Sequence, residues 1–322
     1  MGKITVLRAA ALTTVQDLGR SAQRRSGVSV GGALDPHAAR VANLLEGNLE
    51  TDALLEMTPG KTRIRFHDQR VIAWCGGEFR VRIEEINLPA GRSAFVRSGE
   101  EVAIDPPARG CRAWFAFSGG IDLPPVLGSR ATDLRGGFGG LEGRALRDGD
   151  ELPLGLAAQP RQDSARIASW GAPADWACIT ATEATLRVTR GMEWADFTPA
   201  AQRAFFRERF KISTKVDRMG ARLEGPQLCR NSATELLSAA VAPGTIQVPN
   251  DGQPILLLGD CQTIGGYPKI AHVITVDLAI AAQVRPNDDI RFDAVSLRQA
   301  RELFATRADD LAQFRLGLRL RV

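Results

Sequence analysis

Short runs of alternating or continuous apolar residues, each ended by turn-forming residues, are the feature that most constrains how this chain folds. Examples bounded by Gly, Pro, Asn or Asp are Lys3–Arg8, Arg63–His67, Arg70–Cys75, Ala113–Ser118 and Ile255–Leu258. Runs of this length and punctuation are typical of strands in sandwiches and barrels. The sequence therefore predicts a mainly β fold of the α+β class, with a few short helices.

Helical patterns interrupt the strand pattern at several places. Asp35-Pro36 combines an N-cap with proline at the first helical position, which predicts a helix through about Glu46. Ser296 is expected to cap another helix with one apolar face, running through about Phe314. Shorter helices are expected over residues 200–209 and 271–283.

The chain has 322 residues, which suits two domains better than one core. The weakest pattern lies over Leu156–Ala168, between a strand-like end and a new apolar phase. We place the domain boundary there, which predicts an N-terminal β domain over residues 1–158. Residues 159–322 would then form a second β domain with the C-terminal helix.

Charge and apolar runs exclude several classes of partner. The net charge of +4 is spread over 41 basic and 37 acidic residues, without the basic stripe and interleaved aromatics of a nucleic-acid binder. The longest apolar run, Val273–Val284, is interrupted by Asp277 and is too short to span a membrane. The N-terminus meets polar residues too early for a signal peptide. We therefore expect a cytoplasmic protein that binds neither nucleic acid nor membrane.

The 5 cysteines are odd in number and widely separated, which argues against a disulfide framework. No two of them lie at metal-ligand spacing, and the histidines at positions 37, 67 and 272 do not complete such a set. We expect no metal site in this chain.

The glycine-rich segment Gly136–Gly143, GGFGGLEG, has two interpretations. It could form a nest of backbone amides that holds an anion, or a sharp turn between strands. The segment matches neither the dinucleotide fingerprint nor the Walker A spacing, so the turn is favoured. Any ATP chemistry would need a different site or a partner chain.

The string Gly27–Gly31, GVSVG, matches the G-x-S-x-G nucleophile elbow by letters alone. The elbow requires a strand before the serine and a helix directly after it. Here the helix begins only at Asp35, so the context argues against a serine hydrolase.

Several polar residues near the first helix are candidates for a binding role. Asp35 is most simply a helix cap, yet helix N-termini and their loops also bind ligands. Asn43 lies within the helix, and Glu56 lies in the apolar run 53–57. A carboxylate in such a run must be paired or hydrogen-bonded, which raises the odds of a function.

Arg218 and Arg222 flank Gly220 on one short segment. Two planar guanidinium groups at this spacing suit recognition of a carboxylate or phosphate. The alternative is ordinary surface charge, which is common in a chain so rich in arginine.

Polar groups are densest over Gln247–Lys269, QVPNDGQPILLLGDCQTIGGYPK. Around the apolar strand 255–258 lie Gln247, Asp260, Gln262, Thr263, Tyr267 and Lys269. A strand that ends in polar groups above a glycine turn can present donors to a substrate. A solvated hairpin explains residues 250–252 well, but it explains the cluster from Asp260 onward poorly.

A family resemblance extends over nearly the whole chain. The segments that carry it, in order, are Thr14–Arg20, Gly31–Pro36, Ala42–Asn48, Ser118–Ser129, Ala131–Leu134, Gly139–Arg144, Asp148–Asp150, Asp217–Arg222 and Gln247–Lys269. Together they resemble the KipA-like family, also called allophanate hydrolase subunit 2, which includes the C subunit of bacterial 5-oxoprolinase. The same domain occurs in the carboxyltransferase half of biotin-dependent urea carboxylases.

The resemblance implies two cyclophilin-like β-barrel units and a hetero-oligomer with two partners, a KipI-like B subunit together with an A subunit. It implies ATP-dependent opening of 5-oxoproline to glutamate, with ATP, and with it Mg²⁺, acting at the level of the complex. On chemical grounds Arg218 or Arg222 would bind the substrate carboxylate, and Gln247 or Gln262 its lactam amide. Lys269 would stabilise an anionic intermediate, with Asp260 as acid or base and Tyr267 as a third catalytic candidate.

The chain departs from the family pattern at Ile264, where relatives usually have threonine in Thr-Thr-Gly-Gly-Tyr-Pro. The loss of this hydroxyl leaves open another lactam or a urea-like substrate. One alternative function is the carboxyltransferase component of a biotin-dependent urea or amide carboxylase. This chain lacks an Ala-Met-Lys-Met site, so biotin would be carried elsewhere. A KipA-like regulatory binding protein is the alternative from another class.

Overall fold

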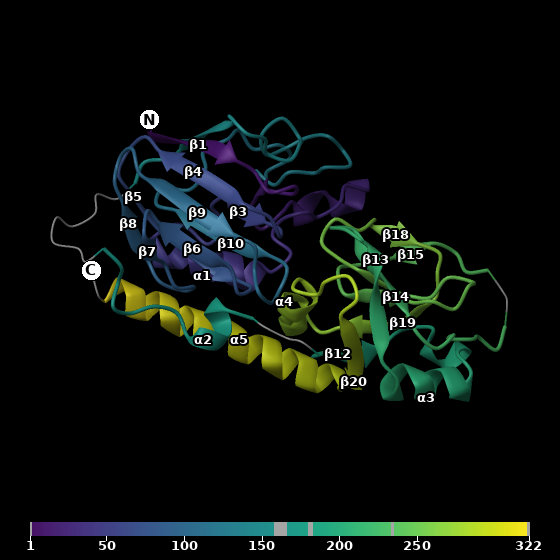
Figure 1. Ribbon diagram of the computed structural model, residues 1–322. Helices are drawn as coiled ribbons and strands as arrows, with labels where there is room; N and C mark the ends of the chain where they lie inside the picture. Colours follow the sequence, from purple (N-terminus) through teal and green to yellow (C-terminus); the bar gives the residue numbers. More distant parts are fainter. Residues whose placement is uncertain (1, 158–165, 180–182, 233–234, 321–322) are drawn as a thin grey trace. The chain divides into compact units, whose positions relative to one another are not determined.

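The computed structural model describes residues 2–157, 166–179, 183–232 and 235–320 (Figure 1). The chain forms two compact units. The first unit comprises Met1–Arg20, Gly31–Thr180 and Arg315–Val322, and the second comprises Ser21–Val30 and Ala181–Phe314. The boundary predicted between residues 158 and 159 falls outside the described residues. No helix in the described part of the chain has the length and apolar character needed to cross a bilayer.

The first unit contains two antiparallel sheets. In order across the sheet, the six-stranded one consists of β11 (Glu151–Leu154), β1 (Gly2–Arg8), β4 (Thr62–Phe66), β9 (Glu101–Asp105), β6 (Arg80–Ile83) and β7 (Ile86–Asn87). The five-stranded one consists of β2 (Thr14–Gln16), β3 (Leu54–Met57), β10 (Ala113–Phe117), β5 (Arg70–Gly76) and β8 (Ala94–Val96).

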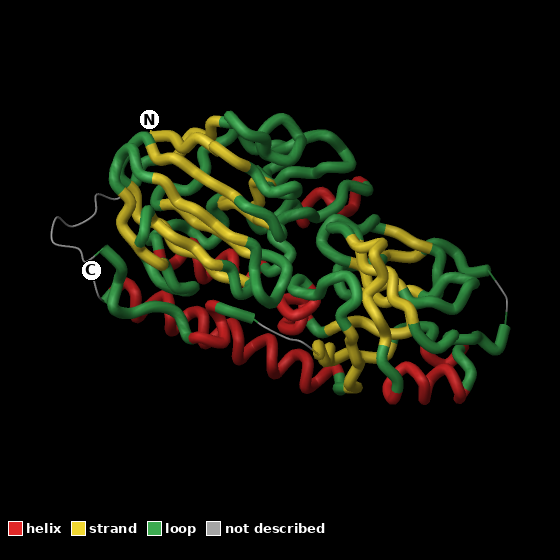
Figure 2. Tube along the Cα trace, viewed as in Figure 1, coloured by secondary structure: helices red, strands yellow, loops and turns green. Residues whose placement is uncertain are grey.

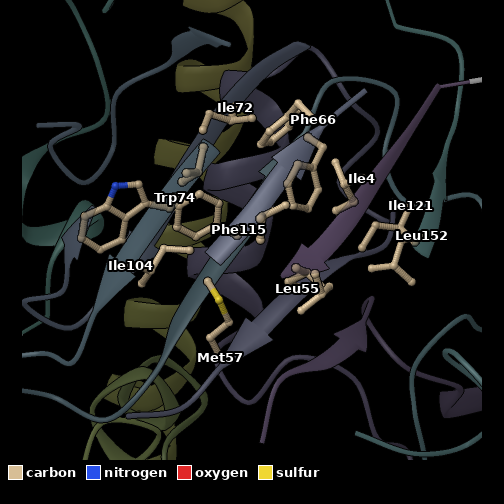
Figure 3. Close-up of a cluster of buried hydrophobic side chains, with 14 of the residues drawn as sticks. Ile4, Leu55, Met57, Phe66, Ile72, Trp74, Ile104, Phe115, Ile121 and Leu152 are labelled. Carbon is tan, nitrogen blue, oxygen red and sulfur yellow. The ribbon is translucent and has the colours of Figure 1, made fainter. Parts of the chain in front are cut away.

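A single apolar core is formed by both sheets of this unit (Figure 3). Strand β4 alternates, with Ile64 and Phe66 buried and Arg63 and Arg65 exposed, as expected for a strand with one face in water. Strand β10 is buried along its whole length. The reason is that helix α1 (Pro36–Leu45) packs against β10 and β5.

Helix α1 begins as the sequence predicts. The Asp35 carboxylate accepts hydrogen bonds from the backbone N–H groups of His37 and Ala38 at 2.9 and 3.0 Å, and Pro36 occupies the first helical position. Such a cap satisfies donors that the first turn leaves without a partner. Asp35 therefore fixes the start of the helix.

The second unit is built around a closed barrel. In order around it, the strands are β12 (Glu183–Arg190), β19 (Lys269–Val273), β16 (Thr245–Gln247), β17 (Ile255–Leu257), β14 (Gly220–Glu224), β13 (Phe210–Val216) and β20 (Asp289–Ala294). A separate pair joins β15 (Ala239–Ala240) to β18 (Ile264–Gly265). Phe205 stacks on Phe292 with ring centroids 4.5 Å apart in the aromatic core. The mainly β prediction is confirmed.

The remaining helices are few, as Figure 2 shows. They are η1 (Ser21–Ser26), α2 (Ala174–Ala177), η2 (Trp194–Asp196), α3 (Pro199–Arg207), η3 (Thr275–Asp277), α4 (Leu278–Ala281) and α5 (Leu297–Arg319). The predictions of α3 and α5 are confirmed within a few residues. The helix expected over 271–283 is wrong at its start, because β19 pairs there with β12 and β16. Strand pairing overrides the local helical pattern.

Candidate functional site

The structure assigns the predicted site residues to different units. Asp35, Asn43 and Glu56 belong to the first unit. The other eight belong to the second, namely Arg218, Arg222, Gln247, Asp260, Gln262, Thr263, Tyr267 and Lys269. Within the second unit we use the name Lys269 cluster for Lys269, Glu193, His272, Gln247 and Gln262.

A β-bulge sets the direction of Lys269. Along the β16–β19 ladder, Ile246 pairs with Ala271, but Gln247 pairs with Lys269, so Ile270 is the extra residue on β19. Bulges of this kind redirect a side chain and are common beside active sites. Lys269 therefore lies directly opposite Gln247 on the neighbouring strand.

Lys269 is a buried cation, only 4% exposed. Its Nζ lies 3.5 Å from Oε1 of Glu193, and its backbone N–H donates to Oε2 of the same carboxylate at 2.9 Å. One carboxylate thus holds both the main chain and the charge of Lys269. A buried charge needs such a partner because its desolvation is costly.

His272 is the titratable neighbour of this ion pair. Burial is the main cause that lowers its pKa below the ordinary value of 6.5, and the Lys269 charge lowers it further. The Glu193 carboxylate acts in the opposite direction. Nδ1 of His272 lies 3.2 Å from Oγ1 of Thr245 on the neighbouring strand. These contacts favour a neutral imidazole beside Lys269 at neutral pH.

The two glutamines form a chain of amide groups. Nε2 of Gln262 donates to Oε1 of Gln247 at 3.3 Å, and Nε2 of Gln247 points to the carbonyl of Tyr267 at 3.4 Å. Gln247 is 1% exposed, whereas the Tyr267 ring is about half exposed. The predicted polar segment thus links two amides, one of them on the residue opposite Lys269 in the ladder, and leaves its aromatic ring at the surface.

Two glycines permit this close packing. A Cβ atom at Gly265 would lie 2.7 Å from Nε2 of Gln247, and a Cβ at Gly191 would collide with the backbone carbonyl of Lys269. Neither glycine has a positive φ. Both are therefore required by space at the Lys269 cluster and not by backbone conformation.

Arg218 and Asp260 form one buried ion pair. The guanidinium donates through Nε and Nη2 to the two carboxylate oxygens at 2.8 and 2.9 Å. The side chains are 5% and 8% exposed. Bidentate pairing of this kind is the strongest geometry available to an arginine. The Nε and Nη2 donors of Arg218 are therefore already bonded to a carboxylate of this chain.

Arg222 is more exposed and has a different partner. Its Nη1 lies 3.0 Å from Asp251, and the two side chains are 39% and 48% exposed. Exposed pairs of this kind contribute little to stability and are easily exchanged.

Thr263 is bonded through its main chain. Its backbone carbonyl accepts a hydrogen bond from the Val241 N–H at 3.0 Å.

The candidates of the first unit are fixed by hydrogen bonds. Glu56, 1% exposed, accepts at 2.9 Å from the Leu34 N–H and from Nε1 of Trp114. Asn43 is fully buried and donates to the Asp52 carbonyl at 2.8 Å. These contacts anchor the loop before α1 and the turn after it.

The glycine-rich segment 136–143 forms a turn, as the sequence favours. The N–H of Gly136 donates to the Asp133 carboxylate, and those of Gly137, Gly140 and Gly143 donate to backbone carbonyls. Amides that are bonded internally in this way do not form an anion nest. Across the described residues, no group of His, Cys, Asp and Glu side chains has the arrangement needed to hold a metal ion.

Glu193 and His272 are the functional candidates that the sequence does not reveal. Glu193 lies in a short apolar and acidic stretch before η2, and no motif or spacing connects it with Lys269. His272 could have been suggested by strand alternation on β19, but the bulge at Ile270 changes that alternation.

Known proteins resemble this chain over most of its length. Residues 26–294 match the family model described as carboxyltransferase domain, subdomain A and B. The chain is 39% identical to the C subunit of 5-oxoprolinase from Escherichia coli over 92% of its length and 93% of that protein. It is 34% identical to the corresponding C subunit from Haemophilus influenzae, over 93% of this chain and 94% of that one.

A solved structure of a larger protein has the same fold. The urea amidolyase of K. lactis superposes with a TM-score of 0.89 at 28% identity and covers 97% of this chain. This chain spans 20% of that protein, so the similarity concerns one region of it.

Proposed function

This chain belongs to the carboxyltransferase domain family, subdomains A and B, and from that premise we propose that it is the C subunit of an ATP-dependent 5-oxoprolinase. The observation that carries the proposal is the similarity to the Escherichia coli protein over more than nine tenths of both chains. The Lys269 cluster supports it with an ordered set of amides beside a buried cation.

The proposed activity belongs to a cytoplasmic complex. The proposed partners are a KipI-like B subunit together with an A subunit, and ATP with Mg²⁺ acts at the level of that complex. In the glycine segment 136–143, the N–H groups of Gly136, Gly137, Gly140 and Gly143 are bonded internally, so we assign ATP binding to the partners. This chain would contribute binding and orientation of the lactam and charge stabilisation.

Lys269 is the proposed electrostatic group. Opening a lactam places negative charge on its carbonyl oxygen, and a preorganised cation in a water-poor site lowers the energy of that charge. Glu193 holds the ammonium and the main chain of Lys269 in place. We therefore assign stabilisation of the anionic intermediate to Lys269.

Gln247 and Gln262 are the proposed amide-recognition groups. A lactam carries one N–H donor and one C=O acceptor, and a glutamine side chain offers the complementary pair. The hydrogen bond between the two glutamines orients both of them before a substrate arrives. Thr263 would complete this binding surface, and Tyr267 is a further proposed catalytic group.

Asp260 and Arg218 are proposed to act as a unit. The carboxylate is the candidate acid or base, and the guanidinium orients it through two hydrogen bonds. Arg222 has an exposed partner that a substrate carboxylate could replace. Asp35, Asn43 and Glu56 remain proposed substrate-binding residues of the first unit, where they fix the two ends of α1.

A second function is favoured by one observation. The similarity to a region of K. lactis urea amidolyase is consistent with a carboxyltransferase component of a biotin-dependent urea or amide carboxylase. Urea and a lactam share an amide group, so the glutamine pair would suit both. Biotin would then be carried by another chain, since this one has no Ala-Met-Lys-Met site.

The test is to co-express this chain with its two proposed partners and to follow 5-oxoproline with and without ATP. The proposal predicts loss of 5-oxoproline and release of glutamate only when ATP is present. Biotin-dependent incorporation of bicarbonate into urea, without loss of 5-oxoproline, would establish the alternative instead. An intact complex that performs neither reaction would favour a regulatory binding protein.

A further inference from the structure

An early segment of the sequence is part of the second unit. Ser21–Val30 groups with Ala181–Phe314, although the residues on both sides of it belong to the first unit. The segment contains the 3-10 helix η1, with arginines at positions 24 and 25 in its last turn. The chain therefore contributes two cations from a distant part of the sequence to the unit that holds Lys269.

Arg24 contacts the loop that carries the candidate site residues. Its Nη2 donates to the carbonyl of Val241, and the N–H of Val241 donates to Thr263 at 3.0 Å. Val241 also packs with Cys261, the residue before Gln262. The guanidinium is close enough to influence the Cys261 thiol, whose pKa burial raises to about 11 and the Arg24 charge partly lowers.

Charge pairing distinguishes Arg24 from the three cations among the candidate site residues of this unit. Arg218 is held by Asp260, Arg222 by Asp251 and Lys269 by Glu193. Arg24, in contrast, donates through one nitrogen to the neutral backbone carbonyl of Val241. Within the described part of the chain, no carboxylate lies within ion-pair distance of Arg24. A half-buried guanidinium paired only with a carbonyl retains donors for an anion.

We propose that Arg24 binds the carboxylate of the lactam substrate and thereby determines specificity for an anionic lactam. The inference rests on the proposed 5-oxoprolinase function and deepens it. Arg218 is buried and bidentate with Asp260, so recruiting it for a substrate would leave that carboxylate without its main partner. Arg222 would likewise have to give up Asp251 to bind the substrate. Arg24 needs no such exchange, because among the described residues no carboxylate lies within ion-pair distance of it.

The test compares two neighbouring arginines in the reconstituted complex. Arg24→Gln removes the proposed contact, and Arg25→Gln makes the same charge change at an exposed position of the same helix. KM and kcat are measured for 5-oxoproline, for 2-pyrrolidinone, which is the same lactam without its carboxylate, and for ATP. Arg24→Lys tests whether a charge without the planar fork restores function.

Arg24→Gln is expected to raise KM for 5-oxoproline about 10- to 100-fold, with kcat changed little, because one charge-assisted contact is lost. The KM values for 2-pyrrolidinone and ATP should stay at the wild-type level, and Arg24→Lys should recover part of the loss. Arg25→Gln should match the wild type. An increase in KM for ATP instead would show that Arg24 binds phosphate, and equal losses on both lactams would show a structural role. Either result overturns the inference.

Direct binding separates this inference from the proposed function. Calorimetry with 5-oxoproline and with 2-pyrrolidinone is carried out on the same complexes without ATP. If the wild-type complex binds 5-oxoproline through Arg24 but does not hydrolyse it, the proposed function fails and the inference stands. If hydrolysis proceeds and the Kd is the same in Arg24→Gln, the inference fails alone. Failure of the wild type to prefer 5-oxoproline over 2-pyrrolidinone also overturns the inference.

Discussion

Glu193 holds Lys269 at two points, accepting its backbone N–H at 2.9 Å and lying 3.5 Å from its ammonium. The bulge at Ile270 brings Lys269 opposite Gln247, and the carboxylate keeps it there. The position and the charge of Lys269 therefore depend on Glu193, a residue outside the segment Gln247–Lys269.

Glu193→Ala tests this dependence through stability. Both side chains of the pair are largely buried, at 4% and 12% exposed, so the variant leaves a buried charge without its partner. We expect a loss of about 3–5 kcal/mol in the free energy of unfolding, measured by urea denaturation. Glu302→Ala, which breaks the exposed pair with Arg298, should cost less than about 1 kcal/mol. Equal losses in the two variants would contradict a structural role for Glu193.

Gly265→Ala tests the packing of the amide pair. The added methyl group would lie 2.7 Å from Nε2 of Gln247, so this amide must move. Because small displacements of a binding group are costly, KM for 5-oxoproline should rise roughly 10- to 100-fold with the fold retained. Gly266→Ala is the matched control, since its nearest neighbour would be 3.3 Å away. An unchanged KM in Gly265→Ala would remove Gln247 from substrate binding.

Glu46 makes the stability of the first unit depend on pH. Burial raises its pKa from 4.5 to about 8, against a smaller opposing effect of the Ser93 hydroxyl. Between these values the folded chain retains a proton that the unfolded chain loses. The contribution of Glu46 is therefore complete below about pH 4.5 and is lost as the pH rises through about 8.

Glu46→Gln removes this titration while preserving the size of the side chain. The wild type should lose up to about 1.4 kcal/mol of unfolding free energy per pH unit across the window, relative to the variant. Urea denaturation at several pH values measures the difference. Glu302→Gln, at an exposed position, should follow the wild-type curve. If Glu46→Gln also follows the wild-type curve, Glu46 is ionised in the folded protein.

Much of the framework could be predicted because it depends on local patterns. Asp35-Pro36 encodes its helix start through capping, and the alternating strands encode a mainly β fold. The density of polar residues over Gln247–Lys269 likewise indicated three of the five residues of the Lys269 cluster, namely Gln247, Gln262 and Lys269. These features require only neighbours in the sequence.

The remainder depends on contacts between distant residues. Glu193 reaches Lys269 across 76 positions of sequence, and Arg24 reaches Val241 across 217. No spacing rule connects such pairs. The helix expected over 271–283 was wrong at its start for the same reason, because strand pairing there outweighs local propensity. The pairing of Arg218 with Asp260 was also invisible in the sequence, where both appeared as separate candidates.

Lys269→Met gives the most direct test of the central claim, that this chain supplies the Lys269 cluster to an ATP-dependent lactam hydrolase. Methionine removes the charge from the cluster, and Lys211→Met makes the same change at an exposed position of the same unit. Glutamate release from 5-oxoproline is measured in the complete complex with ATP, after native mass measurement confirms assembly. We predict a fall in kcat of about 100-fold or more for Lys269→Met and wild-type activity for Lys211→Met. Full activity of an assembled Lys269→Met complex would contradict the claim.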